Sequence, residues 1–412
     1  MYFNPRLESL IADNKLRIQS DSGTGGEGGA PGEPGQPGQP GQAGSGSACG
    51  GGGTPGPPAP PTPPNLPGQP GPKGSVGVSS DKNYATVEVF YATDRKRQDL
   101  NRYGNERSES GSLSLGSCAI SVPLNHKLGK LENPSVWKLE FRADPGRHIV
   151  LLDTKQHTYQ EFYDRVASTI RASKKTEALV FVHGYAVSFE DAVRRSAQLA
   201  VDLKFDGAII TYSWPSAAAV EKYPTDESTI EWTAPHLRWF LEDLSRRSGA
   251  KAVNLIAHSM GNRALASAMK SMVLESGAAS RPRFQQIVMA APDVDAGVFA
   301  SLIQTMESAA ERITLYASSR DRALQASKKF HTYPRAGEAG PGIIVLPGLD
   351  TIDASTVETD FMEHSYFGDS RSVLFDIFEL FESHLPPIDR FGLERRTNAA
   401  GSYWAFRPYT PY

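Results

Sequence analysis

The sequence predicts an α/β protein whose central sheet is mostly parallel and covered by helices on both faces. Short apolar runs typical of buried strands recur from residue 179 onwards, at residues 179–182, 208–212, 253–257, 287–290, 313–316 and 343–346. Segments with helical periodicity lie between most of these runs, as at 192–203 and 265–272. Strands that are apolar on both faces and alternate with helices are typical of a parallel sheet with both faces covered.

A different pattern precedes these runs and predicts antiparallel strands at one edge of the sheet. Residues that favour β-structure alternate or cluster at 87–91, 119–123, 136–141 and 149–152. Globular patterning therefore begins near Ala85, and we expect one α/β domain over residues 84–412. With 412 residues in all, the chain is long enough to bury a sizeable core.

Residues 20–80 predict a disordered Gly/Pro-rich arm, preceded by a short N-terminal segment at residues 1–19. Gly, Pro, Gln and Ser dominate the arm, so it cannot bury enough apolar surface to offset its ordering entropy. Gly occupies every third position over residues 32–41, the spacing of a collagen triple helix, but the register breaks at 54–61. We therefore expect a linker, and trimerisation through a collagen-like stalk is the less favoured alternative.

Composition excludes several classes of function. A net charge of -3 and a sequence pI near 6.3 argue against a nucleic-acid partner. Cys49 and Cys118 are too few for a disulfide framework and lack metal-ligand spacing. No phosphate-binding loop, dinucleotide fingerprint or metal-ligand cluster occurs, so we expect no metal and no cofactor. Because no signal peptide or membrane-spanning run is evident, we expect a cytoplasmic chain.

Ser259 is the strongest candidate for a catalytic residue. It stands in the segment Ala257-His258-Ser259-Met260-Gly261, between a predicted strand and a predicted helix. A sharp strand-to-helix turn of this kind, the nucleophile elbow of the α/β-hydrolase fold, pushes its central side chain out of the path of the chain and needs small residues two positions before and after it. Ala257 stands where Gly is usual, and one methyl is the smallest possible departure. A serine that caps a helix is the alternative interpretation.

Two backbone amides are candidates for an oxyanion hole. The strand at 179–182 runs into His183-Gly184-Tyr185, where this fold places its second oxyanion donor. We expect the amides of Tyr185 and Met260 to hold the oxyanion, since the following helix aims its N-terminal amides at the same place. An ordinary tight turn is the alternative for His183-Gly184.

A nucleophilic serine needs a base, and the fold orders its partners along the chain as serine, acid, histidine. Downstream of Ser259 only His331, His364 and His384 remain. His331 comes soon after the last candidate acid, and His384 ends an apolar helix, where capping explains it. His364 lies in a loop between the last predicted strand and that helix, so we expect it to be the base.

The acid has two candidate positions. Asp321 follows the strand at 313–316, the commonest place for the acid in this fold, and is the favoured candidate. Asp293 and Asp295 follow the preceding strand, at 287–290, a position that some lipases use. Helix capping is the alternative for all three aspartates and outweighs catalysis for Asp293 and Asp295.

The order and number of these motifs resemble a bacterial α/β-hydrolase family of unknown function in the esterase/lipase superfamily, the DUF900 type. The resemblance runs from about Tyr84 to the C-terminus. It rests on FYATDR at 90–95, FVHGY at 181–185, YSWPS at 212–216, AHSMG at 257–261, AAPD at 290–293, SRDRAL at 319–324 and HSYF at 364–367. It implies the hydrolase fold and a triad of Ser259, Asp321 and His364. It implies no particular substrate.

The sequence thus predicts a serine hydrolase that cleaves a small-molecule carboxylic ester through an acyl-enzyme. Thioesters and amides use the same groups, so the bond cleaved stays open, as do chain-length preference and oligomeric state. The alternative is a catalytically silent, hydrolase-like binding or scaffold protein that associates through its arm. Residues 215–238 are a candidate lid, and the aromatic residues in and beside it either line an acyl site or pack in the core: Trp214, Tyr223, Trp232 and Trp239.

Overall fold

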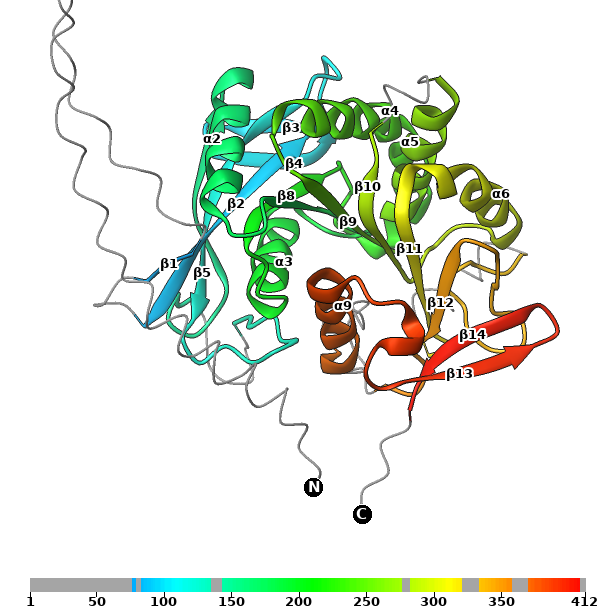
Figure 1. Ribbon diagram of the computed structural model, residues 1–412. Coiled ribbons are helices and arrows are strands. Elements are labelled where there is room, and N and C mark those ends of the chain that lie inside the picture. The colour runs from blue at the N-terminus through cyan, green and yellow to red at the C-terminus, as the bar shows by residue number, and fades with distance from the viewer. Residues whose placement is uncertain are drawn as a thin grey trace, which may run out of the picture. The chain divides into compact units, whose positions relative to one another are not determined.

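A twelve-stranded mixed sheet forms the centre of the computed structural model (Figure 1). The structure describes residues 76–78, 83–134, 143–275, 282–320, 333–357 and 370–407. The predicted arm, the segment before it and the predicted strand at 136–141 lie outside the described residues. The domain boundaries around the arm therefore stay a prediction.

Six adjacent strands of the sheet are parallel, as the alternation of apolar runs and helices predicts. Their spatial order is β12-β11-β10-β9-β7-β8, and every neighbouring pair is parallel. They span Glu177–Val182 (β7), Gly207–Ser213 (β8), Ala252–His258 (β9), Phe284–Ala290 (β10), Ala310–Ala317 (β11) and Leu349–Asp353 (β12). Their carboxyl ends consequently lie along one edge, where α/β proteins bind their ligands.

Antiparallel strands extend the sheet on the β8 side, which confirms the prediction from the earlier β-forming segments. There β2 (Tyr84–Thr93) pairs in parallel with β8 and in antiparallel fashion with β5 (Ser114–Pro123), and β6 (Val150–His157) forms the edge. A short strand, β1 (Val76–Val78), pairs with β2. A separate ribbon of β3 (Arg95–Asp99) and β4 (Arg102–Arg107) was not predicted.

The prediction of a strand at 343–346 is wrong. That run has no regular secondary structure, and the strand beside β11 is β12, which starts just after Gly348. The run has the apolar composition of a strand, but it packs on the core as a loop. Ile343 is 3% exposed, and the Ile344 carbonyl accepts a hydrogen bond from Thr351. Beyond β12, a hairpin of β14 (Gly401–Phe406) and β13 (Leu393–Asn398) completes this edge.

Alternate residues of each central strand face two separate hydrophobic cores. In β7, Val180 and Val182 belong to one core and Leu179 and Phe181 to the other, as the two-residue period of a strand requires. The first core is covered by α2 (Tyr159–Ala172), α4 (Tyr223–Arg247), α5 (Gly261–Glu275) and α6 (Ala296–Met306). The second is covered by α3 (Phe189–Asp202) and α9 (Arg371–Ser383), which Figure 1 shows apart from the others. Helices on both faces confirm the predicted fold class.

Three single turns of 3-10 helix complete the regular structure of the described residues: η2 (Val220–Lys222), η3 (Glu307–Ala309) and η4 (Pro387–Asp389). Within the described ranges, no helix combines the length and the apolar character that crossing a bilayer requires.

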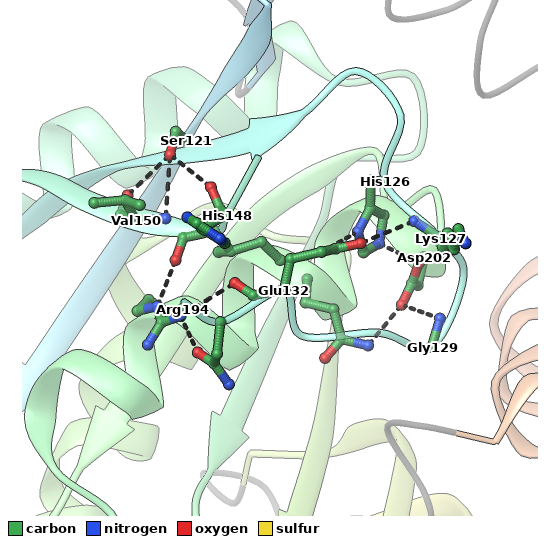
Figure 2. Close-up of polar contacts among 12 residues, drawn as sticks. Ser121, His126, Lys127, Gly129, Glu132, His148, Val150, Arg194 and Asp202 are labelled. Atoms are coloured by element: carbon green, nitrogen blue, oxygen red, sulfur yellow. Dashed lines mark hydrogen bonds and ion pairs between the residues drawn. The ribbon is translucent and has the colours of Figure 1, made fainter. Parts of the chain in front are cut away.

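A buried charge cluster fastens α3 to the loop after β5 (Figure 2). The two ring nitrogens of His126 contact different carboxylates, Asp202 at 2.9 Å and Glu132 at 2.8 Å. Burial alone lowers the pKa of His126, but Asp202 and Glu132 together raise it to about 10. The amide of Gly129 also donates to Asp202. Because Asp202 is the last residue of α3, the cluster fastens the carboxyl-terminal end of that helix to the loop after β5.

Candidate active site

Ser259 occupies a sharp turn between β9, which ends at His258, and α5, which begins at Gly261. Its φ is 50°, in the left-handed region that residues other than glycine seldom adopt. The side chain is 4% exposed, and its Oγ has no hydrogen-bond partner among the described residues. The sharp strand-to-helix turn at the carboxyl edge of the sheet agrees with the local geometry that the five-residue motif predicts, and the role of Ser259 as nucleophile stays a prediction.

Asn262 holds the turn, a role that the sequence alone did not indicate. Its Nδ2 donates to the carbonyl oxygens of Ala257 at 3.2 Å, Ser259 at 3.1 Å and Ala290 at 3.1 Å. The Ser259 amide donates to the same Ala290 carbonyl, at 3.0 Å. These bonds tie the turn to the end of β10 and offset the cost of the strained φ.

Residues 183–187 pass directly over the turn. They carry Tyr185, a predicted oxyanion donor, and are hereafter called the oxyanion loop after that prediction. A Cβ built on Gly184 would lie 3.0 Å from the Ser259 Cβ, so glycine allows this close approach. Tyr185 is 8% exposed, and its ring packs against Tyr223 with 5.3 Å between centroids.

Met260 and Tyr185, the two predicted oxyanion donors, follow paired neighbouring strands. Met260 follows Ser259 and is fully buried. The backbone hydrogen bonds that close the turn, as far as the structure describes it, include none donated by Met260. β7 and β9 are parallel and adjacent, so the two amides come to the same edge of the sheet. Their role as oxyanion donors stays a prediction.

Asp321 and His364 lie outside the described residues, but the loops that carry them begin side by side. β11 and β12 are paired, and the Ala354 amide donates to the Ala317 carbonyl at 2.8 Å where the two strands end. One step further, the Ser319 amide donates to the Ser355 Oγ, also at 2.8 Å. The two loops therefore start from one point on the carboxyl edge of the sheet.

The alternative acids differ from each other. Asp295 caps α6 by accepting from the amides of Gly297 and Val298, which confirms the capping interpretation. For Asp293 that interpretation is wrong, because its buried carboxylate pairs with Arg335 at 3.1 Å and accepts from the Tyr223 hydroxyl at 2.5 Å. A buried partner of opposite charge accounts for Asp293 without a catalytic role.

None of the described histidines forms a hydrogen bond with Ser259 Oγ. His384 caps the end of α9 in a left-handed conformation, as predicted, with φ of 53°. His236 contacts Asp94 at 2.9 Å, and His157 contacts Glu161 at 3.0 Å. Of the nine histidines of the chain, His331 and His364 lie outside the described residues.

His183 is the histidine of the oxyanion loop, and its environment excludes it as a base. Burial and the nearby charge of Arg95 hold its pKa well below the usual range. Its Nδ1 lies 2.7 Å from the Gly184 carbonyl, which can only accept, so Nδ1 carries the hydrogen. The ring is therefore a neutral acceptor at Nε2.

The candidate lid is fastened to the site at its start. Trp214 is fully buried, stacks on His183 with 5.2 Å between centroids, and donates to the His183 carbonyl. Tyr223 is 3% exposed. Further along α4 the aromatic residues are more open: Trp232 is half-buried beneath Arg107, and Trp239 is 56% exposed. The alternative that these aromatic side chains pack in the core therefore holds for Trp214 and Tyr223 and is wrong for Trp239.

The strand order and the strained serine between β9 and α5 define an α/β hydrolase. In agreement, residues 158–380 match the model of the family described as "Alpha/beta hydrolase of unknown function (DUF900)". The match covers more than half of the chain, so the chain belongs to this family. The resemblance inferred from the motifs is confirmed.

Several solved structures are similar over part of the chain. A gene product of Listeria innocua is 14% identical over 51% of this chain and 95% of its own, with a TM-score of 0.33. Inhibited esterase B from Lactobacillus rhamnosis is 10% identical over 71% and 90%, with a TM-score of 0.30. Phospholipase PlaB from Legionella pneumophila is 14% identical over 47% and 42%, with a TM-score of 0.22. Similarity this low indicates no substrate. Comparison with curated proteins found no match.

Proposed function

We propose that this α/β hydrolase is a serine hydrolase that cleaves carboxylic esters through an acyl-enzyme, with Ser259 as nucleophile, His364 as base and Asp321 as the orienting acid. The observation that carries the proposal is the state of Ser259. Its hydroxyl stands in a strained turn, is buried, and has no partner among the described residues. A left-handed serine between a strand and a helix, whose hydroxyl is not used in the fold's own described hydrogen bonds, is available to a base and to a substrate carbonyl.

The remaining geometry supports the assignment of the partners. His183, the histidine of the oxyanion loop, is neutral and held in place on both ring nitrogens. The loops that carry Asp321 and His364 start together, two and three strands away from β9. Neighbouring strands lie about 4.8 Å apart. Asp321 and His364 stand four and eleven residues beyond the ends of β11 and β12, so the chain is long enough to bring both side chains back to Ser259.

In the proposed reaction, His364 takes the proton of Ser259 as Oγ attacks the ester carbonyl carbon. The negative charge that develops on the carbonyl oxygen is held by the amides of Tyr185 and Met260. His364 then gives the proton to the departing alkoxide, which leaves an acyl group on Ser259. Water, deprotonated by the same imidazole, releases the acid and restores the enzyme. Asp321 holds the ring so that the nitrogen facing Ser259 is the unprotonated one.

A fluorophosphonate, which reacts with activated serines, tests the proposal. We expect the purified chain to be labelled and Ser259→Ala to be unlabelled. His364→Ala should slow labelling by at least about 1000-fold, whereas His331→Ala, the matched control, should leave the rate nearly unchanged. Absence of labelling in the wild type, or equal labelling of Ser259→Ala, would overturn the serine hydrolase proposal. The alternative, a catalytically silent binding or scaffold protein, would then replace it. A series of p-nitrophenyl esters of graded length then defines the acyl preference.

A further inference from the structure

Arg95 is a charged residue enclosed within the fold beside the candidate site. Arg95 is 1% exposed and is the first residue of β3, two residues beyond the end of β2 at the carboxyl edge of the sheet. The guanidinium donates to the Ser213 Oγ at 2.9 Å and to three carbonyl oxygens, those of Gly104, Ser216 and Val187, at 3.2, 3.2 and 2.8 Å. It also donates to Asn105 at 3.1 Å.

Arg95 makes two contacts with the oxyanion loop. Besides the bond to the Val187 carbonyl, Arg95 Nη2 lies 3.3 Å from His183 Nε2. Because His183 carries its hydrogen on Nδ1, its Nε2 accepts this bond. Arg95 thus holds the first and the last residue of the loop that carries the Tyr185 amide.

The loop between these two residues is strained and needs such restraint. Ala186 has a φ of 55°, which costs free energy for any residue with a Cβ. Its amide donates to Asp226 at 3.2 Å, and the Val187 amide donates to Ser216 Oγ at 3.1 Å. Ser216 in turn accepts from Arg95 through its carbonyl, so the guanidinium and the Asp226 carboxylate hold the loop from two directions.

The charge of Arg95 has no ion-pair partner among the described residues, where all its hydrogen bonds go to neutral acceptors. Burial lowers the pKa of the guanidinium, and the fields of Asp94, Asp226 and Asp191 oppose that change. The positive charge of Arg95 offsets part of the negative field of Asp226, whose carboxylate accepts from the Ala186 amide, and so shifts the potential beside the loop towards positive values.

We propose that Arg95 is a positioning residue for the oxyanion hole: it fixes residues 183–187 so that the Tyr185 amide faces the developing oxyanion, and its charge adds to the positive potential there. The proposal rests on the proposed hydrolase function. The Thr93-Asp94-Arg95 segment would then be part of the family resemblance because it shapes this loop from the neighbouring strand.

Two substitutions separate geometry from charge. Arg95→Lys keeps a positive charge but cannot reproduce the planar fork, and Arg95→Met removes both. With a p-nitrophenyl ester and active sites counted by fluorophosphonate titration, we expect kcat to fall about 100-fold in Arg95→Met and by less in Arg95→Lys, with KM changed less than about threefold. Guanidinium at millimolar concentration should restore part of the activity of Arg95→Ala, which a purely structural role would not predict.

Arg390→Met is the matched control. Arg390 is also a fully buried arginine, but it pairs with Asp376 at 3.0 Å and contacts no residue of the oxyanion loop. This variant should lose stability while each titrated site keeps its kcat. If Arg95→Lys and Arg95→Met also keep kcat per titrated site within about threefold, the proposal is overturned.

Hydrogen exchange of a peptide containing residues 184–188 provides a readout independent of catalysis. Exchange should accelerate in Arg95→Lys relative to the wild type, and unchanged exchange would contradict the positioning role. A wild-type protein that fails to react with fluorophosphonate would overturn the serine hydrolase function, whereas a reactive wild type with fully active Arg95 variants would overturn only the role of Arg95.

Discussion

Gly261 and His183 approach so closely that no side chain fits between them: a Cβ on Gly261 would lie 2.4 Å from the His183 carbonyl oxygen and 2.8 Å from that of Val182. The contact joins the first residue of α5 to the end of β7. It sets the distance between the turn that carries Ser259 and the oxyanion loop. The positions of both therefore depend on the absence of a Cβ at Gly261.

Gly261→Ala should therefore destabilise the fold by about 3 kcal/mol, since a backbone oxygen cannot move aside without displacing β7. Urea unfolding measures the change in the free energy of unfolding. Gly342→Ala is the matched control, because a Cβ at Gly342 would meet nothing within 4 Å and should leave stability nearly unchanged. Equal stability of the two variants would mean that the contact is looser than the structure gives it.

The choice of acid predicts two different kinds of defect. Asp321→Asn should lower kcat by about 10⁴-fold with little effect on stability, because it removes the charge that orients the base. Asp293→Asn should cost about 3 kcal/mol of stability, since Arg335 would be left buried without its carboxylate. Ester hydrolysis per titrated site and urea unfolding measure the two effects. The opposite pattern would make Asp293 the acid.

The candidate lid predicts a separation between specificity and stability. Trp232→Ala should shift the preferred ester chain length while costing less than about 1 kcal/mol, because Trp232 is only half-buried. Trp214→Ala, its control in the core, should cost about 4 kcal/mol. Profiles with p-nitrophenyl esters and thermal unfolding report the two effects. A large loss of stability in Trp232→Ala, with an unaltered profile, would assign Trp232 to core packing.

The cluster around His126 predicts a pH-dependent contribution to stability. Because Asp202 and Glu132 raise the pKa of His126 from 6.5 to about 10, its contribution is complete below pH 6.5 and is lost as the pH rises through about 10. The difference in unfolding free energy between the wild type and His126→Gln should therefore be largest, about 3 kcal/mol, at and below pH 6.5. It should shrink as the pH rises towards about 10.

His157→Gln gives the control of opposite sign for this measurement. Burial lowers the pKa of His157, so the wild type should lose stability relative to this variant as the pH falls below 6.5. Urea unfolding across the pH range measures both series. A His126→Gln difference that stays constant from pH 6.5 to about 10 would show that the ring is not charged in the fold.

The sequence by itself determined the class of fold and the position of the turn that carries Ser259, the candidate nucleophile. Both follow from local rules: apolar runs with the length of strands alternate with helical periods, and the turn at Ser259 needs small neighbours at fixed spacing. The same rules failed at residues 343–346, because an apolar loop that packs on a core has the composition of a strand. They also could not reveal β14, whose pairing with β12 is a long-range contact.

Only the tertiary structure decided which polar residues support the site. Arg95 ends one motif of the family resemblance, but the sequence assigned no role to it or to Asn262 and Asp226, since each contacts backbone groups that come from other strands and loops. The structure likewise gave Asp293 a buried ion pair with Arg335, a residue 42 positions away in the chain. Local periodicity predicts which residues are buried. The hydrogen-bond and ion-pair partners of a polar side chain are distant in the sequence, so they are fixed only once the strands pair. The candidate nucleophile can therefore be recognised in the sequence, whereas the residues that contact its turn and the neighbouring loop are found only in the fold.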